Sequence, residues 1–422
     1  MDGFLTVGQP AAVTAVHAML GSRVPHAVLL VGPASVGKHQ LAMDLAAGLL
    51  CTGASGGDRP CRTCRTCRMV EHGNHPDLHT LGPIGAGGQV VIGGEETDKR
   101  GVRDLVAELA LLPVEGGERV AIIREAHRMN EHAQSAILKT LEEPPSATTL
   151  VLVADDEELL LPTIRSRCAR IRLGTVGPRA IEQLLGAAGL ADAPTAARLA
   201  RLGGGRPGVA MAYAAAPEAE AVRAEIVRTL LDLMRKGRSE RLVAAKTLQG
   251  RALDLARLLE PPVGDDAPAA AGPKRGKGKG KAVAVAAADT DAGDASADRT
   301  SGGSGEGSGE GSGEGAAAGD GEGSGGAKAT AADRRRGLAL LIELWRDLAR
   351  DLACVQRGAP RAVRDTALLE ELEAAAKGLQ PGAATAALAR LVRASEMLAV
   401  NTTPELILDV LLVRWPVARR AA

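Results

Sequence analysis

Short apolar runs alternate with amphipathic stretches over the first 175 residues of the chain. The apolar runs are continuous and rich in aliphatic side chains, which is typical of strands buried on both faces; they lie at residues 26–31, 120–123 and 149–154. Apolar residues recur at helical spacing between them, at residues 10–20, 40–50, 98–112 and 131–142. This alternation predicts an α/β module with a parallel sheet over residues 1–175, and residues 90–92 are expected to add a short edge strand.

The pattern changes after residue 175. Short amphipathic helices are expected over residues 176–215, and longer ones over 216–260 and again over 333–422. Between these, residues 261–332 consist largely of Gly, Ala, Ser, Pro and charged residues, and such a segment cannot bury enough apolar surface to fold. The sequence therefore predicts a small helical domain and an all-α domain that a disordered insertion interrupts.

The charge balance excludes a strong overall attraction to nucleic acid or to anionic membranes. Lys and Arg together number 51, and Asp and Glu also number 51, so any contact with DNA has to be local. Met1-Asp2-Gly3 lacks the basic start of an export signal, and no apolar run approaches the length that crosses a bilayer. We expect a cytoplasmic protein with no membrane contact, whose six cysteines are reduced or bind metal.

Four of the cysteines lie close together with the spacing C-x9-C-x2-C-x2-C: Cys51, Cys61, Cys64 and Cys67. Four thiolates in so short a stretch suit a tetrahedral, structural Zn²⁺. The alternative is an iron–sulfur cluster, because ferredoxins use a similar run of cysteines. That run would require a fourth cysteine where this chain has Glu71, so zinc is the preferred interpretation.

Residues 32–39, with the sequence G-P-A-S-V-G-K-H, connect an expected strand to an expected helix. In a P-loop, backbone N–H groups cradle phosphates at the helix N-terminus and the lysine reaches the outer phosphates. Gly32, Gly37 and Lys38 are therefore the candidate nucleotide-binding residues, although the Ser or Thr that gives its hydroxyl to Mg²⁺ is replaced by His39. Two alternatives stay open: a plain turn before a core helix, and a loop that binds nucleotide without hydrolysing it.

A second magnesium position is also altered. The apolar run at 120–123 leads into Arg124-Glu125 at the carboxyl end of the expected strand, which is where open parallel sheets bind ligands. An active P-loop ATPase has an aspartate in place of Arg124, and a guanidinium cannot ligate Mg²⁺, which takes oxygen ligands. We therefore expect no Mg²⁺ site and no intrinsic ATP hydrolysis. The acidic pair Asp155-Asp156, at the end of the run at 149–154, would in addition repel a γ-phosphate.

The stretch at 119–145, RVAIIREAHRMNEHAQSAILKTLEEPP, resembles the clamp-loader branch of the AAA+ ATPases, and within it the δ′ family of bacterial DNA polymerase III. The V-G-Q sequence at 7–9, the cysteine module after the P-loop helix and the S-R-C sequence at 166–168 fit the same family. The resemblance covers the chain apart from the insertion. It implies a P-loop (AAA+) module with a zinc knuckle at 51–67, followed by a helical lid and a helical collar.

The resemblance also implies roles for two arginines. Arg167, in the S-R-C motif, would act in trans as an arginine finger that stabilises charge on ATP held by a neighbouring subunit. Arg206, in the Gly-rich turn at 203–208, would take the sensor-2 position of the lid. The implied partners are the γ/τ and δ subunits in a hetero-pentameric ring, the sliding clamp by weak or indirect contact, and primed DNA through the complex. The chain would be a non-hydrolysing accessory subunit of a DNA polymerase that helps to load the clamp in replication.

Two other functions are weighed against this one. The first is the ATP-hydrolysing motor subunit of the same complex, which is γ/τ-like; His39 and Arg124 argue against it. The second is a DNA-binding zinc protein that would use the basic side chains between the cysteines, Arg62, Arg65 and Arg68. The neutral net charge and the lack of interleaved aromatic side chains count against that function. We expect these three arginines to balance the thiolate charge and to stay in solvent.

Overall fold

The structure is a computed structural model that describes residues 3–84, 88–93, 100–115, 117–259, 330–399 and 403–418. The predicted insertion at 261–332 lies outside the described residues except for its last three positions.

Five parallel strands form one sheet in the order β2-β3-β4-β1-β5. The strands are β1 (Ala27–Val31), β2 (Leu78–Leu81), β3 (Arg119–Ile123), β4 (Thr148–Ala154) and β5 (Ala169–Arg172). The three strands that the apolar runs predict, β1, β3 and β4, are the central ones, and every residue in them is buried. The predicted parallel α/β sheet is therefore confirmed.

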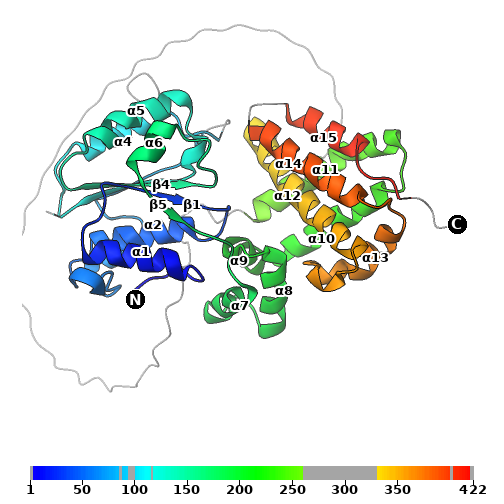
Figure 1. The fold of residues 1–422 in the computed structure, drawn as a ribbon, viewed down its shortest axis with the longest axis horizontal. Helices are drawn as coiled ribbons and strands as arrows, with labels where there is room; N and C mark the ends of the chain where they lie inside the picture. Colours follow the sequence, from blue (N-terminus) through cyan, green and yellow to red (C-terminus); the bar gives the residue numbers. More distant parts are fainter. Residues whose placement is uncertain are drawn as a thin grey trace, which may run out of the picture. The chain divides into compact units, whose positions relative to one another are not determined.

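Helices cover both faces of this sheet (Figure 1). One face packs against α1 (Pro10–Gly21) and α2 (Lys38–Leu49), and the other against α4 (Val102–Leu109), α5 (Glu131–Glu142) and α6 (Pro162–Arg167). Successive strand residues alternate between the two cores, so that Leu30 of β1 lies in the first and Leu29 in the second. Three shorter helices, η1 (Gly56–Asp58), α3 (Arg65–Glu71) and η2 (Ala126–Arg128), lie in the connections.

Two predicted elements differ from the structure. Residues 90–92 do not form a strand; Val90 makes only an isolated bridge with Met129, and the edge of the sheet is β2. The helix predicted at 98–112 is shorter, because Gly101 packs closely against Gly93 and its N–H is bound at 2.7 Å by the Asp104 carboxylate, which starts α4 at Val102. Residues 98 and 99 lie outside the described part.

The remaining described elements are helical. They are α7 (Pro178–Ala187), α8 (Ala193–Gly203), α9 (Pro207–Ala215), α10 (Glu218–Leu233), α11 (Arg238–Leu258), α12 (Ala331–Gln356), η3 (Pro360–Ala362), η4 (Thr366–Leu368), α13 (Leu369–Lys377), α14 (Ala383–Ala399) and α15 (Pro404–Val413). One hydrophobic core runs through them from Val176 to Ala418. In it the rings of Trp345 and Trp415 lie 5.2 Å apart between centroids and are tilted by 55° to each other. The helices expected at 176–215 thus share their core with the later ones.

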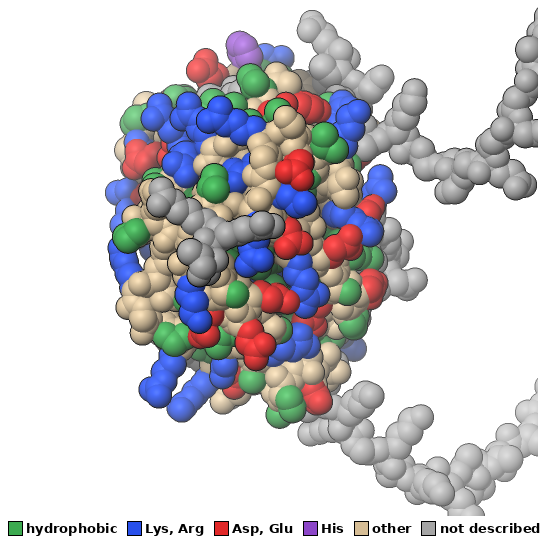
Figure 2. Space-filling model, turned by 90° about the vertical axis from the view of Figure 1, so that its right-hand side faces the viewer, with side chains coloured by type: hydrophobic (Ala, Val, Ile, Leu, Met, Phe, Trp, Pro, Cys, Tyr) green, Lys and Arg blue, Asp and Glu red, His purple; other side chains and the backbone are tan. Residues whose placement is uncertain are grey.

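The surface agrees with the balanced charge of the sequence. Figure 2 shows one face of the molecule, on which basic and acidic side chains intermingle and hydrophobic side chains are scattered. In the part of the chain that the structure describes, none of the helices combines the length and the apolar character that a membrane crossing requires.

Candidate functional site

The P-loop lies between β1 and α2, and two contacts from distant parts of the chain hold its backbone. The side-chain amide of Gln9 donates to the carbonyl of Val36 at 3.3 Å and to that of Gly174 at 2.6 Å. The N–H of Gly208, at the start of α9, donates to the carbonyl of Ser35 at 3.0 Å. Ser35 takes a positive φ of 61°, a strained conformation that is typical of functional loops. These contacts fix the backbone of the loop that the sequence predicts to bind nucleotide.

Lys38 is fully engaged by the protein itself. Its side chain is only 4% exposed, and its ammonium donates to the carbonyls of Gly32 and Pro33 at 2.7 and 2.5 Å. The third partner is the carboxylate of Asp155, at 2.7 Å. An ammonium has three N–H donors, and all three have acceptors here. A phosphate that binds Lys38 must therefore displace one of these three acceptors, and Asp155 is the one that carries a negative charge.

His127 braces Asp155 in this position. The backbone N–H of Asp155 donates to Nδ1 of His127 at 3.2 Å. Burial lowers the pKa of His127, although Asp155 partly opposes this, so the ring is neutral at pH 7 and its Nδ1 can accept. Asp155, which the sequence analysis expected to repel a γ-phosphate, is therefore the counter-ion of Lys38.

The two positions that would hold Mg²⁺ carry nitrogen groups. Arg124 leaves the end of β3, and its guanidinium packs against Gly82. His39 keeps part of its surface in solvent, but the exclusion of water from the rest of the ring and the nearby Arg124 cation lower its pKa to about 4. At neutral pH the positions therefore offer one cation and one neutral imidazole, and neither provides the oxygen ligand that Mg²⁺ requires.

Glu125 has a carboxylate, but that group is turned to a local partner. Its backbone has a φ of 49°, and its side chain pairs with Arg128 at 2.9 Å. Both groups are partly exposed, so the ion pair is weak and solvent-screened.

The four predicted metal ligands come together. Cys51 follows α2, Cys61 lies in the loop, Cys64 caps α3 and Cys67 lies within α3; all four Sγ atoms are within 4.8 Å of one another. A tetrahedron with Zn–S bonds of about 2.3 Å has S···S edges of about 3.8 Å. The Sγ atoms of Cys51 and Cys64 are 4.0 Å apart, so the cluster has the size that a tetrahedral ion needs.

The surroundings of the sulfur atoms also suit a metal. Backbone N–H groups of Cys64 and Cys67 donate to Cys61 Sγ and Cys64 Sγ, both at 3.4 Å. Burial alone would raise the pKa of Cys64, but hydrogen bonds, that of the Thr66 hydroxyl first among them, lower it to about 5 and favour the thiolate. A Cβ atom at Gly53 would lie 2.9 Å from Cys61 Sγ, so glycine leaves room for the cluster. These four residues can hold a metal ion.

Arg62 has a role that the sequence did not indicate, and the expectation that it stays in solvent was wrong. Its side chain is 13% exposed, donates to the carbonyl of Gly3 at 2.6 Å and pairs with Glu71 at 3.2 Å and with Asp44 of α2. Asp44 is completely buried and also accepts the N–H of Thr6 at 2.9 Å. Arg62 therefore fastens the cysteine module to α2 and to the start of the chain.

Arg167 is the last residue of α6. Its guanidinium donates to the carbonyl of Thr163 at 3.0 Å and pairs with Glu142, the last residue of α5, at 2.7 Å. The side chain is 35% exposed, so it lies at the surface with a replaceable partner. The neighbouring thiol of Cys168 packs against the core, and burial raises its pKa to about 11.

Arg206 is paired with acidic side chains of α12. Its guanidinium pairs with Glu343 of α12 at 2.7 Å and lies 3.7 Å from Asp347. The turn that carries Arg206 does reach the P-loop, through Gly208. The sensor-2 role of Arg206 and the finger role of Arg167 stay predictions.

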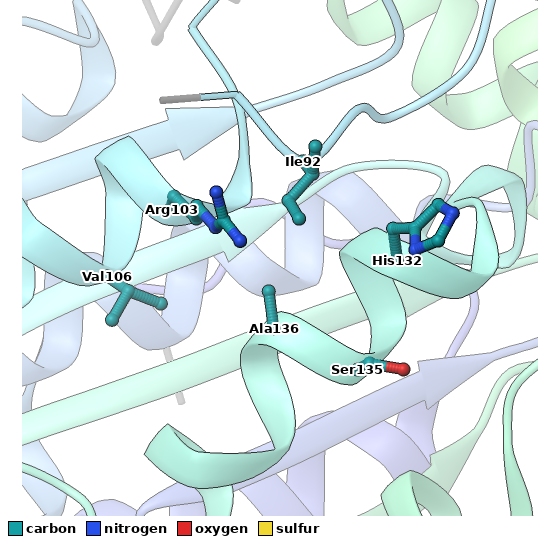
Figure 3. A pocket seen from close by; sticks show the side chains of 6 residues that line it. All are labelled: Ile92, Arg103, Val106, His132, Ser135 and Ala136. Atoms are coloured by element: carbon teal, nitrogen blue, oxygen red, sulfur yellow. The ribbon is translucent and has the colours of Figure 1, made fainter. Parts of the chain in front are cut away.

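A pocket opens on the outer side of the sheet module, between α4 and α5 (Figure 3). It is lined by Ile92, Arg103, Val106, His132, Ser135 and Ala136. None of these six residues is among the catalytic, nucleotide-binding or metal-ligating candidates of the sequence analysis. The pocket marks the solvent side of α5, whereas Gln134 and Ile137 of the same helix are buried.

Comparisons with known proteins point to one family. A family model described as "DNA polymerase III, delta subunit" matches residues 8–176. A DNA polymerase III subunit delta′ from Pseudomonas aeruginosa is 37% identical over 206 residues, which cover 46% of this chain and 57% of the relative. The subunit delta′ from Bacillus subtilis is 34% identical over 163 residues, covering 39% and 46%. A subunit tau from Escherichia coli is 32% identical over 199 residues, covering 46% and 29%.

The chain thus spans about half the length of the δ′ relatives that it matches. A solved structure from Thermotoga maritima, described as a DNA polymerase III gamma subunit-related protein, is 13% identical, covers 95% of this chain and 97% of that chain, and has a TM-score of 0.39. That likeness is too distant to carry a conclusion. Residues 8–176 match this family model, and the chain is δ′-like in its similarity to the subunits named delta′.

Proposed function

We propose that this chain is a clamp-loader subunit of a bacterial DNA polymerase III in replication, and that it does not hydrolyse ATP itself. Its relatives that are named subunit delta′ support the first part. The second part is carried by one observation: where an ATPase would hold Mg²⁺, the end of β3 presents Arg124, a cation. Lys38, held by Asp155, supports the same conclusion.

The chain would then act on ATP that is bound to a neighbouring subunit. Arg167 lies at the surface of a rigidly packed module, and a guanidinium is always charged. In a ring it would reach the phosphates of ATP on the adjacent γ/τ subunit and stabilise the charge that develops there. The δ subunit, the sliding clamp and primed DNA are the further partners in this proposal.

The Cys51–Cys67 cluster would hold one structural Zn²⁺. All four positions are taken by protein ligands, so no coordination site is left for a substrate. A closed Cys₄ site fits a role in folding, since it ties the end of α2 to α3. Arg62 would then also hold the start of the chain in place, through its hydrogen bond to the carbonyl of Gly3.

Co-purification and ATPase assays test this function together. The chain should co-purify with γ/τ and δ subunits, and it should raise the DNA- and clamp-stimulated ATPase of the complex while showing no turnover alone. The sequence likeness to τ and γ subunits favours a motor subunit as the second candidate. Steady hydrolysis by the isolated chain, abolished by Lys38→Ala, would establish that candidate instead.

A further inference from the structure

A small pocket lies between α8, α10 and the segment at 364–368. It has a volume of about 210 Å³, and the charged side chains that line it are four arginines and two carboxylates. Pockets for drug-sized molecules measure about 300–1,000 Å³, so this one suits a small ion. The positive groups exceed the negative ones by two charges, which favours an anion. The six charged residues are Arg198, Glu220, Arg223, Arg228, Arg364 and Asp365.

Arg223 is the most deeply buried of these arginines. It is 6% exposed, and among the residues that the structure describes its guanidinium has one acceptor, the carboxylate of Asp365. A guanidinium carries five N–H donors, so most of them have no acceptor in this part of the chain. Ala221 and Ala224 also line the pocket, and side chains as short as these leave it unfilled. Buried polar groups normally have partners, so this guanidinium points to a ligand in the pocket.

Arg364 lines the pocket from the segment between α12 and α13. A Cβ atom at Gly204 would lie 2.6 Å from Cζ of Arg364, so glycine leaves room for this guanidinium. The backbone is held by Asp351, which is 2% exposed and accepts the N–H of Arg364 at 3.1 Å and that of Asp365 at 3.2 Å. The pocket wall is thus ordered before a ligand arrives, which lowers the entropy cost of binding.

The present partner of Arg364 can be exchanged. Arg364 donates to Asp347 of α12 at 2.6 Å, and the two side chains are 27% and 16% exposed. Asp347 also lies 3.7 Å from the guanidinium of Arg206. When Arg364 turns to an anion in the pocket, Asp347 therefore keeps a basic partner, and no carboxylate is left buried and alone.

The other two arginines contribute less. Arg198 and Arg228 are 45% and 57% exposed, and they pair with Glu220 and Glu371. Ion pairs as exposed as these are weak and are screened by salt. Arg223 and Arg364 are therefore the groups on which a bound anion depends.

We propose that Arg223 and Arg364 bind a small anion with a diphosphate group, such as pyrophosphate. A guanidinium is a planar fork that binds phosphate oxygens in pairs. Two forks that line one small pocket match two linked phosphates, and Asp365 can stay with Arg223 through the donor that it uses now. This site goes beyond the proposed function and does not depend on it, since it uses neither the P-loop nor Arg167.

Calorimetric titration of the full chain with sodium pyrophosphate, at constant ionic strength and without Mg²⁺, tests the site. We expect one pyrophosphate per chain. Arg364→Gln should weaken the affinity by about tenfold or more, because charge-assisted hydrogen bonds are about twice as strong as neutral ones. Arg251→Gln is the matched control, because Arg251 is 45% exposed, pairs with Glu225 at 3.0 Å and is not a lining residue.

Two results of this titration would overturn the proposal. The first is an equal affinity of Arg364→Gln and the original chain. The second is a loss of binding in Lys38→Ala but not in Arg364→Gln, because that result would place the anion in the P-loop.

Ala221→Glu tests the same pocket without removing a contact. Ala221 is exposed, and a glutamate near the start of α10 suits the helix dipole, so the variant should fold. Its added carboxylate should repel the anion. Pyrophosphate should therefore raise the melting temperature of the original chain and of Arg251→Gln by mass action, but not that of Ala221→Glu. An equal rise in all three, or no rise in the original chain, would contradict the site.

Two further ligands identify the group that binds. Inorganic phosphate should bind about tenfold more weakly than pyrophosphate, because it cannot engage both guanidinium forks in pairs. Equal affinity for the two ions would overturn the assignment of a diphosphate. Binding of ADP that Arg364→Gln weakens would show that the diphosphate of a nucleotide is accepted, and binding of pyrophosphate without ADP would identify the free ion as the ligand.

Discussion

At the scale of single residues, the hydrogen-bond donors of the P-loop lysine are all bound by groups of the protein itself. Lys38 is held by two carbonyls of its own loop and by Asp155, and His127 supports Asp155. A buried ammonium without a counter-ion is costly, so this arrangement stabilises the loop in the absence of nucleotide. The Asp155 carboxylate occupies the position beside Lys38 that a phosphate would need.

Asp155→Asn should therefore strengthen anion binding at the P-loop. A hydrogen bond to a charged group contributes about 1.5–3 kcal/mol, so we expect an affinity for ATP that is higher by about tenfold or more. Titration with a fluorescent ATP analogue without Mg²⁺ measures it. Asp156→Asn is the matched control, because that carboxylate accepts the N–H of Glu158 and lies outside the Lys38 contact. Equal affinities of the two variants would contradict the account of Lys38.

His39 makes the chain sensitive to acid. Its pKa is about 4 in the folded chain and about 6.5 in an unfolded one, so the unfolded chain binds more protons between these values. The free energy of unfolding should therefore fall as pH drops from about 6.5 to about 4.

His39→Gln should weaken this acid sensitivity. Urea denaturation at pH 7.5 and pH 5 measures it, and the difference between the two midpoints should be smaller in the variant than in the original chain. His75 and His127 are shifted in the same direction, so part of the acid sensitivity should persist. A pH dependence that His39→Gln leaves unchanged would show that this ring does not titrate as described.

At the scale of elements, the cysteine module packs on α2, because Val70 of α3 lies in the same hydrophobic core. The four cysteines lie within this module, and Arg62 pairs with Asp44 of α2. We expect one Zn²⁺ per chain by elemental analysis.

Cys64→Ser should lose this metal. Groups that only orient metal ligands affect affinity by about 10–100-fold, so removal of a ligand should lower zinc affinity by more than about a hundredfold. Limited proteolysis should then cut near α3 while the sheet module stays intact. Cys354→Ser, at a cysteine outside the cluster, should keep one Zn²⁺. Iron with a brown absorbance, or no metal in carefully reduced protein, would contradict the zinc assignment.

The sequence predicted the elements that have a strong local signal. The central strands are continuous apolar runs, and α5 has a typical start, because the side chain of Asn130 accepts the N–H of Ala133 at 2.8 Å. The short strand β5 has only one buried residue in four, Ile171, so no apolar run announces it. The helix α6 was not predicted either, because its six residues are too few to show a helical pattern of apolar positions.

Long-range partners were beyond the reach of sequence patterns. The spacing of the four cysteines predicted their cluster, because the ligands lie within a short segment. Asp155, which pairs with Lys38, and Gly3, whose carbonyl accepts from Arg62, lie far along the chain from these side chains. A spacing rule cannot indicate which carboxylate meets a given cation in three dimensions.

At the scale of the whole molecule, α11 and α12 flank the low-complexity segment and pack together. A Cβ atom at Gly337 would lie 3.1 Å from the Leu253 side chain, so α11 and α12 approach closely near the two ends of the low-complexity segment. Thr330 and Asp333 cap α12 reciprocally, which gives this helix its own start.

Deletion of residues 265–325 should therefore leave folding and assembly nearly unchanged. A short linker can join two helices that already pack side by side. The melting temperature and co-elution with γ/τ and δ subunits measure the effect, and replacement of the segment by a Gly-Ser linker of equal length is the control. Failure of the deleted chain to assemble would mean that these residues make contacts of their own.

The central claim is that this chain acts on ATP held by its neighbour through Arg167. Its pair with Glu142 is partly exposed and contributes about 0–1 kcal/mol to stability, so Arg167→Ala should fold and assemble normally. Arg228→Ala removes a comparable surface pair, between Arg228 of α10 and Glu371 of α13, and serves as the matched control.

The deciding measurement is the DNA- and clamp-stimulated ATPase of the reconstituted complex, followed together with clamp loading. With Arg167→Ala both should fall sharply, by less than the roughly 10³–10⁵-fold effect of fingers in GTPases, because only one of several ATP sites would use this arginine. Arg228→Ala should have no effect. Normal ATPase and normal clamp loading by a fully assembled Arg167→Ala complex would contradict the claim, and Arg165 would become the next candidate.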